Sequence, residues 1–299
     1  MSSAAPVPET RDLTGDDALA ALRRTGWAKL AQDSFLRLRR ADGFSHARSL
    51  SYLTSLVMIQ ALIGLVGLAS VLHKGSLSRV IDHTLRQAVP GPAGHALVTA
   101  VTQANLNAEH HHYGAVLVGL LGSLVTATTA MGQVERGLNR LYGVERDRPT
   151  RAKYQRAFFA ALSAGTLTIF SFVCLAFGND LFQAGSAGAL GDVWSIVRWP
   201  LGTLTIAVAV TVTFRWAPRR RQPHLSWLSV GSALSVLLWV LSTAALGIFL
   251  RLSTLFGSAY GPLAGVVALL LWSLLSSVSL FYGASVAAEL EAQYRTTRS

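Results

Sequence analysis

Long uninterrupted apolar blocks dominate the pattern of hydrophobic and polar positions along this chain. Most of them run for about 18–25 residues, which is the length a helix needs to cross a hydrocarbon layer about 30 Å thick. They do not alternate apolar and polar residues as membrane-spanning strands do, and a helix satisfies its own backbone groups in lipid. The pattern therefore predicts an all-α integral membrane protein with six transmembrane helices, at about 50–72, 114–131, 157–178, 197–214, 227–250 and 260–287.

Composition agrees with this prediction. Of the 299 residues, 51% are hydrophobic and only 14% are charged, and the mean hydropathy is +0.42, whereas an ordinary soluble domain has about 25% charged residues. The first apolar block begins near residue 50, which is too late and too long for the apolar region of a signal peptide. We expect no cleaved signal peptide.

The distribution of charge predicts the topology. With six spans both termini lie on one side of the membrane, together with the segments 132–156 and 215–226, and that side holds 21 of the 26 Lys and Arg residues. The positive-inside rule assigns this side to the cytoplasm. These basic residues follow the ends of the spans, where attraction to anionic lipid headgroups accounts for them. We therefore expect membrane lipids as partners and no nucleic acid.

Besides the connecting segments, four regions outside the spanning helices have an expected structure. Residues 1–15 lack core-forming side chains and predict a disordered tail, and 293–299 form a short C-terminal tail. Apolar residues recur at helical spacing over 16–48, which indicates an amphipathic helix lying on the inner leaflet or packed on the cytoplasmic loops. The external loop 73–113 contains two apolar stripes separated by Pro90-Gly-Pro, and these predict two short helices.

Motifs for common chemistries are missing. The chain has no P-loop, no HExxH and no paired cysteines, so we predict no catalytic residues, no metal and no cofactor. His110, His111 and His112 are adjacent and point in different directions on a helix. They indicate either a solvated loop or a metal or pH-sensing role.

One polar face at the cytoplasmic end of the second span is the candidate substrate-binding site. On a continued helix Glu135, Asn139 and Tyr142 share a face, and arginines occupy the neighbouring one. If the sixth span packs here, we expect Glu135 and Glu289 to lie beside these arginines, either as a structural ion-pair cluster or as a substrate or gating site. The candidate residues are Glu135, Arg136, Asn139, Arg140, Tyr142 and Glu289.

The segment GLNRLYGVERDRP at 137–149 resembles the loop after the second span in the YihY/BrkB family of bacterial inner-membrane proteins. Residues 47–56 and 260–292 resemble the family's first and last spans. The resemblance implies six spans and a bacterial plasma membrane location, and it implies no settled activity. Members were long labelled ribonuclease BN, but a hydrolytic nuclease needs metal ligands or an acid/base pair. The cytoplasmic segments show no metal-ligand spacing, so the sequence favours a protein that is not an enzyme.

The leading hypothesis is a transporter or lipid-handling protein for an amphipathic or anionic envelope molecule. Arg136 and Arg140 would bind the phosphate or carboxylate of that molecule. The alternative is a non-transporting scaffold for envelope assembly. Action on a lipid with Glu135 as the titratable group is a third possibility. Without a P-loop or an acidic residue deep in a span, the pattern favours a passive or partner-powered route.

Overall fold

The computed structural model describes residues 4–10, 13–71, 91–176, 189–253 and 263–296. Throughout these residues the regular structure is helical, in agreement with the predicted all-α class, and it contains no strand. Eight helices fall within the described ranges. They are α1 (Gly15–Thr25), α2 (Trp27–Arg40), α3 (Gly43–Val71), α5 (Gly91–Leu141), α6 (Thr150–Ala176), α8 (Ala189–Trp216), α9 (Leu225–Leu252) and α11 (Ala264–Thr296).

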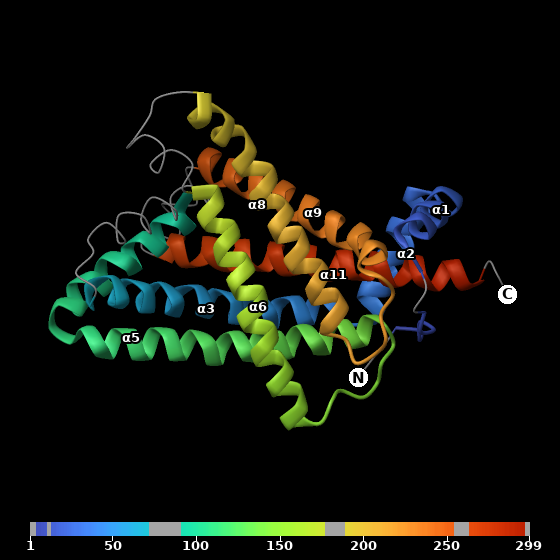
Figure 1. Ribbon diagram of the computed structural model, residues 1–299, viewed down its shortest axis with the longest axis horizontal. Coiled ribbons are helices and arrows are strands. Elements are labelled where there is room, and N and C mark those ends of the chain that lie inside the picture. The colour runs from blue at the N-terminus through green and yellow to red at the C-terminus, as the bar shows by residue number, and fades with distance from the viewer. Residues whose placement is uncertain (1–3, 11–12, 72–90, 177–188, 254–262, 297–299) are drawn as a thin grey trace.

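Helix α11 forms the centre of the bundle (Figure 1). It contacts α9, α5, α3, α2 and α1, while α3 runs alongside α5 and α6 pairs with α8. Phe281, Ala284 and Leu290 of α11 are completely or almost completely buried. Burial of apolar area of this kind stabilises the part of a helical bundle that lies in water. Helix α11 also carries Glu289 and Glu291, two of the acidic residues described below.

Three helices in the described part of the chain are long and apolar enough to cross a membrane, namely Val116–Leu141, Leu225–Leu252 and Ala264–Tyr294. They correspond to the predicted second, fifth and sixth spans. On α5 the side chains of Leu117, Val118, Leu121 and Val125 point outward and are exposed. A row of large apolar side chains on one exposed face is unusual for a protein in water and suits a lipid environment.

Small residues let the helices of the bundle approach closely. A Cβ atom at Gly119 of α5 would overlap the backbone of Gly64 in α3, and a Cβ at Gly231 of α9 would lie 2.6 Å from the carbonyl oxygen of Gly283 in α11. Hydrogen bonds join the same layers, including one of 2.8 Å from the Thr126 hydroxyl to Gln60. Close backbone approach with polar cross-links is typical of helix packing in membranes.

Several element boundaries differ from the prediction. Helix α5 is continuous from Gly91, so the second predicted external helix and the run His110–His112 belong to one long helix rather than to a loop. The first predicted external helix lies outside the described residues. Helix α11 continues to Thr296, beyond both the predicted end of the span and the start of the predicted tail, because its last turns pack on the N-terminal helices. Tyr294 donates a hydrogen bond of 2.9 Å to Asp17 there.

The predicted amphipathic helix at 16–48 is interrupted at Gly26, which has φ +78°, and again at Asp42, which has φ +53°. Its residues therefore belong to α1, α2 and the start of α3. Its buried apolar side chains include Ala18, Leu22 and Leu30, and α1 and α2 pack on α9 and α11. The opposite face exposes Leu19, Trp27 and Phe35. The two helices therefore pack on the end of the bundle and still present apolar side chains outward.

Residues 4–10 form a segment that we call the N-terminal strap. Its amides donate to the end of α5, from Ala4 to the Arg140 carbonyl at 3.2 Å and from Val7 to the Tyr142 carbonyl at 3.1 Å. Ala4, Val7 and Thr10 are buried. This packing differs from the predicted disordered tail, because backbone hydrogen bonds to α5 supply the stabilisation that the composition of the strap does not indicate.

The glycine contact between α3 and α5 generates a prediction. We expect Gly119→Ala to lower the thermal midpoint of the detergent-purified protein, because the added methyl group would force the two helices apart at a cost of about 1–3 kcal/mol. Gly114→Ala in the same helix is the matched control, since a Cβ there meets nothing within 4 Å. Equal midpoints for the two variants, measured by fluorescence-detected size exclusion after heating, would contradict the packing.

Candidate functional site

Helix α5 ends in a turn that brings the rest of the site together. The Gly143 amide donates to the Arg140 carbonyl at 3.2 Å and the Val144 amide to the Asn139 carbonyl at 2.8 Å. Gly143 has φ +73°, a left-handed conformation that favours glycine and commonly terminates helices. A Cβ at this position would lie 2.5 Å from Cα of Pro6 in the strap, so glycine is required by both the turn and the contact.

Asn139 joins the two loops at this end of the bundle. Its side-chain nitrogen donates to Asp147 in the α5–α6 loop (142–149) at 2.9 Å. Its side-chain oxygen accepts from the Arg219 amide in the α8–α9 loop (217–224) at 2.7 Å. The Arg219 guanidinium also donates to the Asp147 carbonyl at 2.7 Å. One buried carboxamide thus fixes the relative position of both loops.

Asp147 is a second junction. Its carboxylate accepts from Lys153 at 2.9 Å and lies 3.4 Å from the guanidinium of Arg136. Burial alone would raise the pKa of Asp147. The hydrogen bonds from Asn139 and Lys153 outweigh this effect and hold the pKa below its ordinary value. The carboxylate is therefore charged at neutral pH, and these contacts favour its charged form.

The two predicted glutamates are paired, but not with the predicted arginines. Glu135 lies 3.1 Å from Arg148 of the α5–α6 loop, and both side chains are buried. Glu289 lies 2.6 Å from Arg37 of α2. The expected pairing with Arg136 or Arg140 is wrong, because Arg136 turns to Asp147 and Arg140 donates to the Glu145 carbonyl at 2.8 Å.

The two arginines that pair with these glutamates, Arg148 and Arg37, also bind backbone carbonyls. Arg148 donates to the carbonyls of Ala217 and Pro218, each at 2.7 Å, and therefore connects α5 to the α8–α9 loop. Arg37 donates to the carbonyls of Ala5 and Leu141, each at 3.0 Å. A guanidinium has five N–H donors, so one arginine can pair with a carboxylate and still hold two loops.

A third buried pair joins Glu291 of α11 to Arg220 of the α8–α9 loop at 2.7 Å, with side-chain exposures of 0% and 2%. Arg220 also donates to the Pro8 carbonyl at 3.1 Å, and Thr10 of the strap donates to Glu291. The guanidinium carbon of Arg220 lies 4.5 Å from the centre of the Tyr142 ring. Burial, followed by the nearby charge of Glu291, raises the pKa of Tyr142, so its hydroxyl stays protonated.

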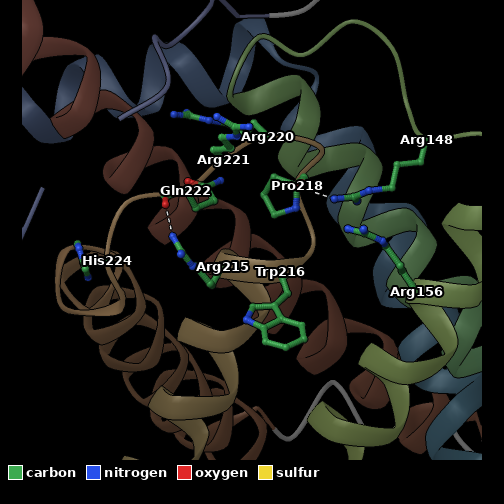
Figure 2. Close-up of a pocket in the computed structure, with 9 residues that line it drawn as sticks. All are labelled: Arg148, Arg156, Arg215, Trp216, Pro218, Arg220, Arg221, Gln222 and His224. Atoms are coloured by element: carbon green, nitrogen blue, oxygen red, sulfur yellow. Dashed lines mark hydrogen bonds between the residues drawn. The ribbon is translucent and has the colours of Figure 1, made fainter. Parts of the chain in front are cut away.

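Next to these pairs lies a basic pocket of about 660 Å³, shown in Figure 2. It is formed by the α5–α6 loop, the start of α6, the end of α8 and the α8–α9 loop, and no acidic residue lines it. We call it the arginine pocket. The lining residues are Arg148, Arg156, Arg215, Trp216, Pro218, Arg220, Arg221, Gln222 and His224.

The arginines of the pocket fall into two groups. Arg148 and Arg220 are neutralised by Glu135 and Glu291. Arg215 donates only to backbone carbonyls, including that of Pro223 at 2.5 Å. The guanidinium groups of Arg156 and Arg221 pair with no carboxylate in the described part of the chain, and the Arg221 backbone amide donates to Glu9 at 3.3 Å. A guanidinium fork matches the geometry of carboxylate and phosphate oxygens. The arrangement can therefore bind an oxyanion.

Sequence reasoning located this end of the bundle but not the pocket. It interpreted Arg215, Arg219, Arg220 and Arg221 as topological and lipid-attracting charges. The signal that could have found the pocket is the pair of basic clusters at 146–156 and 215–221, which the predicted six-span topology places at the same membrane face. Which side chains converge depends on how α6, α8 and α9 pack.

Of the predicted site residues, the structure brings Glu135 and Asn139 into one network with the α5–α6 loop, and places Tyr142 under Arg220. Glu289 lies separately, with Arg37. Arg136 and Arg140 are partly exposed. The side chains of His110–His112 lie outside the described residues. Within the described ranges no group of three or more His, Cys, Asp or Glu residues could hold a metal ion.

The buried Glu135–Arg148 pair generates a prediction about stability. We expect Glu135→Ala to destabilise the protein by about 3–5 kcal/mol, because removing one partner leaves the other charge buried and unpaired. The measurement is chemical or thermal unfolding in detergent. Glu145→Ala is the control, since the Glu145 side chain is exposed, and a comparable loss in both variants would rule out this explanation.

The depressed pKa of Asp147 predicts a pH dependence. The unfolded chain takes up a proton at the ordinary carboxyl pKa before the folded chain does. The contribution of the Asp147 carboxylate to the free energy of unfolding is therefore complete above about pH 4. It is lost as the pH falls further, through the pKa of the folded protein. We expect Asp147→Asn to lower the thermal midpoint at pH 7 and to lower it less at pH 3. Glu145→Gln is the control, and an Asp147→Asn effect independent of pH would contradict the assignment.

The chain was compared with known proteins. A family model described as "Virulence factor BrkB" matches residues 34–299. The "Putative ribonuclease-like protein YfkH" of Bacillus subtilis (strain 168) is 22% identical over 87% of this chain and 94% of its own length. A UPF0761 membrane protein of Alkalilimnicola ehrlichii is 27% identical over 93% of this chain and 62% of its own length. A UPF0761 membrane protein of Chromohalobacter salexigens is 26% identical over 83% of this chain and 60% of its own length.

The chain thus spans about three fifths of these UPF0761 relatives. No solved structure matches it significantly. The family match begins within α2, so the strap and α1 precede it, whereas both loops that form the arginine pocket lie inside it. With more than half of the chain matched, this protein belongs to the BrkB virulence factor family of membrane proteins.

Proposed function

We propose that this chain is a six-span protein of the bacterial inner membrane, with both termini in the cytoplasm, that transports or otherwise handles an anionic amphipathic envelope molecule. Three described helices have the length and hydropathy of spans, and the apolar blocks of α3, α6 and α8 supply the other three. The strap and the end of α11 lie at the same end of the bundle (Figure 1), which agrees with an even number of spans.

The observation that carries the function is the arginine pocket at that end. Five arginines line it, and the guanidinium groups of three of them, Arg156, Arg215 and Arg221, pair with no carboxylate in the described part of the chain. Uncompensated positive charge in a hollow concentrates anions and raises their rate of association. A purely structural cluster would instead pair each charge, as the neighbouring ion pairs do.

The residue at the edge of the pocket, Trp216, favours an amphipathic ligand over a fully water-soluble one. Trp216 ends α8 and its side chain is 72% exposed beside the pocket. Tryptophan concentrates at membrane–water interfaces, because its ring is apolar and its N–H is polar. An anionic headgroup in the pocket would therefore have its apolar part next to the apolar surface of α8.

In this proposal the predicted site residues act as a frame for the pocket. Glu135 and Asn139 hold the two loops whose arginines face the pocket, and Tyr142 supports Arg220 from behind. Glu289 fixes α2 through Arg37. Arg136 and Arg140 at the rim of the same end would add to the attraction of anions.

The experiment is a lipid-movement assay in vesicles without ATP. We expect the reconstituted protein to speed the transbilayer movement of a fluorescent anionic lipid, followed by chemical quenching of the outer leaflet. The double variant Arg156→Ala with Arg221→Ala should slow this movement about tenfold or more, because each charged contact contributes about 1.5–3 kcal/mol.

Arg151→Ala is the matched control, since Arg151 is an exposed arginine of the same region that does not line the pocket. Movement no faster than in protein-free vesicles would reject the transport role and would favour a scaffold. Equal rates for the double variant and the control would reject the pocket as the site.

A further inference from the structure

The inner wall of the arginine pocket contains several buried polar atoms without hydrogen-bond partners. These are Nε and Nη1 of Arg220, both polar atoms of the Gln222 carboxamide, and the hydroxyl oxygen of Tyr142 behind them. Gln222 is 3% exposed and Tyr142 is 1% exposed. Three neighbouring side chains with unpaired buried groups are unusual, because nearly all buried polar groups in proteins have partners.

The three side chains lie close to one another. The Arg220 guanidinium lies over the Tyr142 ring at 4.5 Å. The Gln222 carboxamide lies near enough to the Tyr142 hydroxyl to lower the pKa of that group, in opposition to the dominant effect of burial. Arg220 and Gln222 both line the pocket. The unpaired groups of Arg220 and Gln222 are therefore grouped on its inner wall, with the Tyr142 hydroxyl behind them.

All three side chains can donate at this position. Arg220 offers the N–H groups of two nitrogens, Nε and Nη1, that its bonds to Glu291 and Pro8 do not use, because both of those are made through Nη2. Gln222 offers its NH₂ group and Tyr142 its O–H. Such a set of donors, with one charged member, suits a group that only accepts hydrogen bonds and carries negative charge.

The charge of the pocket selects among such groups. The guanidinium groups of Arg156, Arg215 and Arg221 line the pocket without a carboxylate partner in the described residues. Arg221 is exposed, and only its backbone amide contacts a carboxylate, that of Glu9. A carboxylate would neutralise one positive charge, whereas a phosphate monoester carries about 1.5–2 negative charges at pH 7 and three acceptor oxygens. A terminal phosphate therefore matches both the number of donors and the excess of positive charge.

We infer that the inner wall of the arginine pocket is a phosphate subsite, in which Arg220, Gln222 and Tyr142 donate to a terminal phosphate that Arg156 and Arg221 approach from the opening. This deepens the proposed function and rests on it for the role of the pocket. The phosphate can belong to a lipid headgroup or to a soluble phosphate compound, and the chemistry of recognition is the same for both.

Tyr142→Phe is the most informative variant. It keeps the ring that stacks with Arg220 and removes only a buried hydroxyl that lacks a partner. Removing an unpaired buried polar group is neutral or favourable for folding. We therefore expect the ligand-free variant to have a thermal midpoint equal to or above that of the wild type, and to bind phosphate about tenfold more weakly. Gln222→Leu provides a second variant with the same expectation, and Tyr154→Phe, at an exposed tyrosine, is the control.

Binding is measured as the thermal stabilisation of the full chain in phosphatidylcholine nanodiscs, since a ligand that binds only the folded state raises the midpoint. One arm adds inorganic phosphate, against sodium chloride at equal ionic strength. A second arm replaces part of the lipid by phosphatidic acid, and a third by oleate, which supplies negative charge without phosphate.

Stabilisation by inorganic phosphate and by phosphatidic acid, both weakened in Tyr142→Phe, supports a site for the phosphate group itself. Stabilisation by phosphatidic acid alone supports a lipid headgroup, and by inorganic phosphate alone a soluble ligand. No stabilisation in either arm, equal stabilisation by oleate, or an unchanged response in both variants overturns the inference.

The outcome is separable from that of the proposed function. If anionic lipid with a carboxylate headgroup moves across vesicles while phosphate gives no stabilisation, the inference fails and the transport role stands. If phosphate binds as expected and no lipid moves, the subsite stands and the transport role fails.

Discussion

The organisation of this protein depends on neutralising three carboxylates that two central helices carry into a buried layer. Glu135 of α5 and Glu289 and Glu291 of α11 each pair with an arginine from a different segment, namely the α5–α6 loop, α2 and the α8–α9 loop. A buried charge without its partner costs several kcal/mol. Each pair therefore holds a peripheral segment on the bundle, and together the pairs assemble the end at which the arginine pocket lies.

The same pairs leave the pocket positively charged. Arginines that meet a carboxylate serve the frame, and their remaining N–H groups hold backbone carbonyls of the loops. The guanidinium groups of Arg156 and Arg221 lie beside them and pair with no carboxylate in the described residues. Because the frame is already neutral, these additional charges are available to an anion. Arginine thus supplies both the buried ion pairs that hold the loops and the charged lining of the arginine pocket.

The N-terminal strap belongs to this layer although it precedes the part of the chain that matches the family. Its carbonyls accept from Arg37 and Arg220, and Thr10 donates to Glu291. The strap thereby contacts two of the three ion pairs, Arg37–Glu289 and Arg220–Glu291, and contributes to their burial. Lower local polarity strengthens the pairs and also raises the cost of leaving the donors of the inner wall empty.

The sequence alone determined the helical class, the likeness to the BrkB family, the approximate position of the apolar blocks, and the end of α5 as the place of interest. Hydrophobic block length and the loop at 137–149 suffice for these, because both are local properties of the chain. It did not determine the partners of Glu135 and Glu289, the order in the strap, or the convergence of Arg148, Arg156 and Arg220 on one pocket. Those features join residues far apart in the chain, and only the packing of α2, α5, α8 and α11 decides which long, flexible arginine side chain reaches which carboxylate.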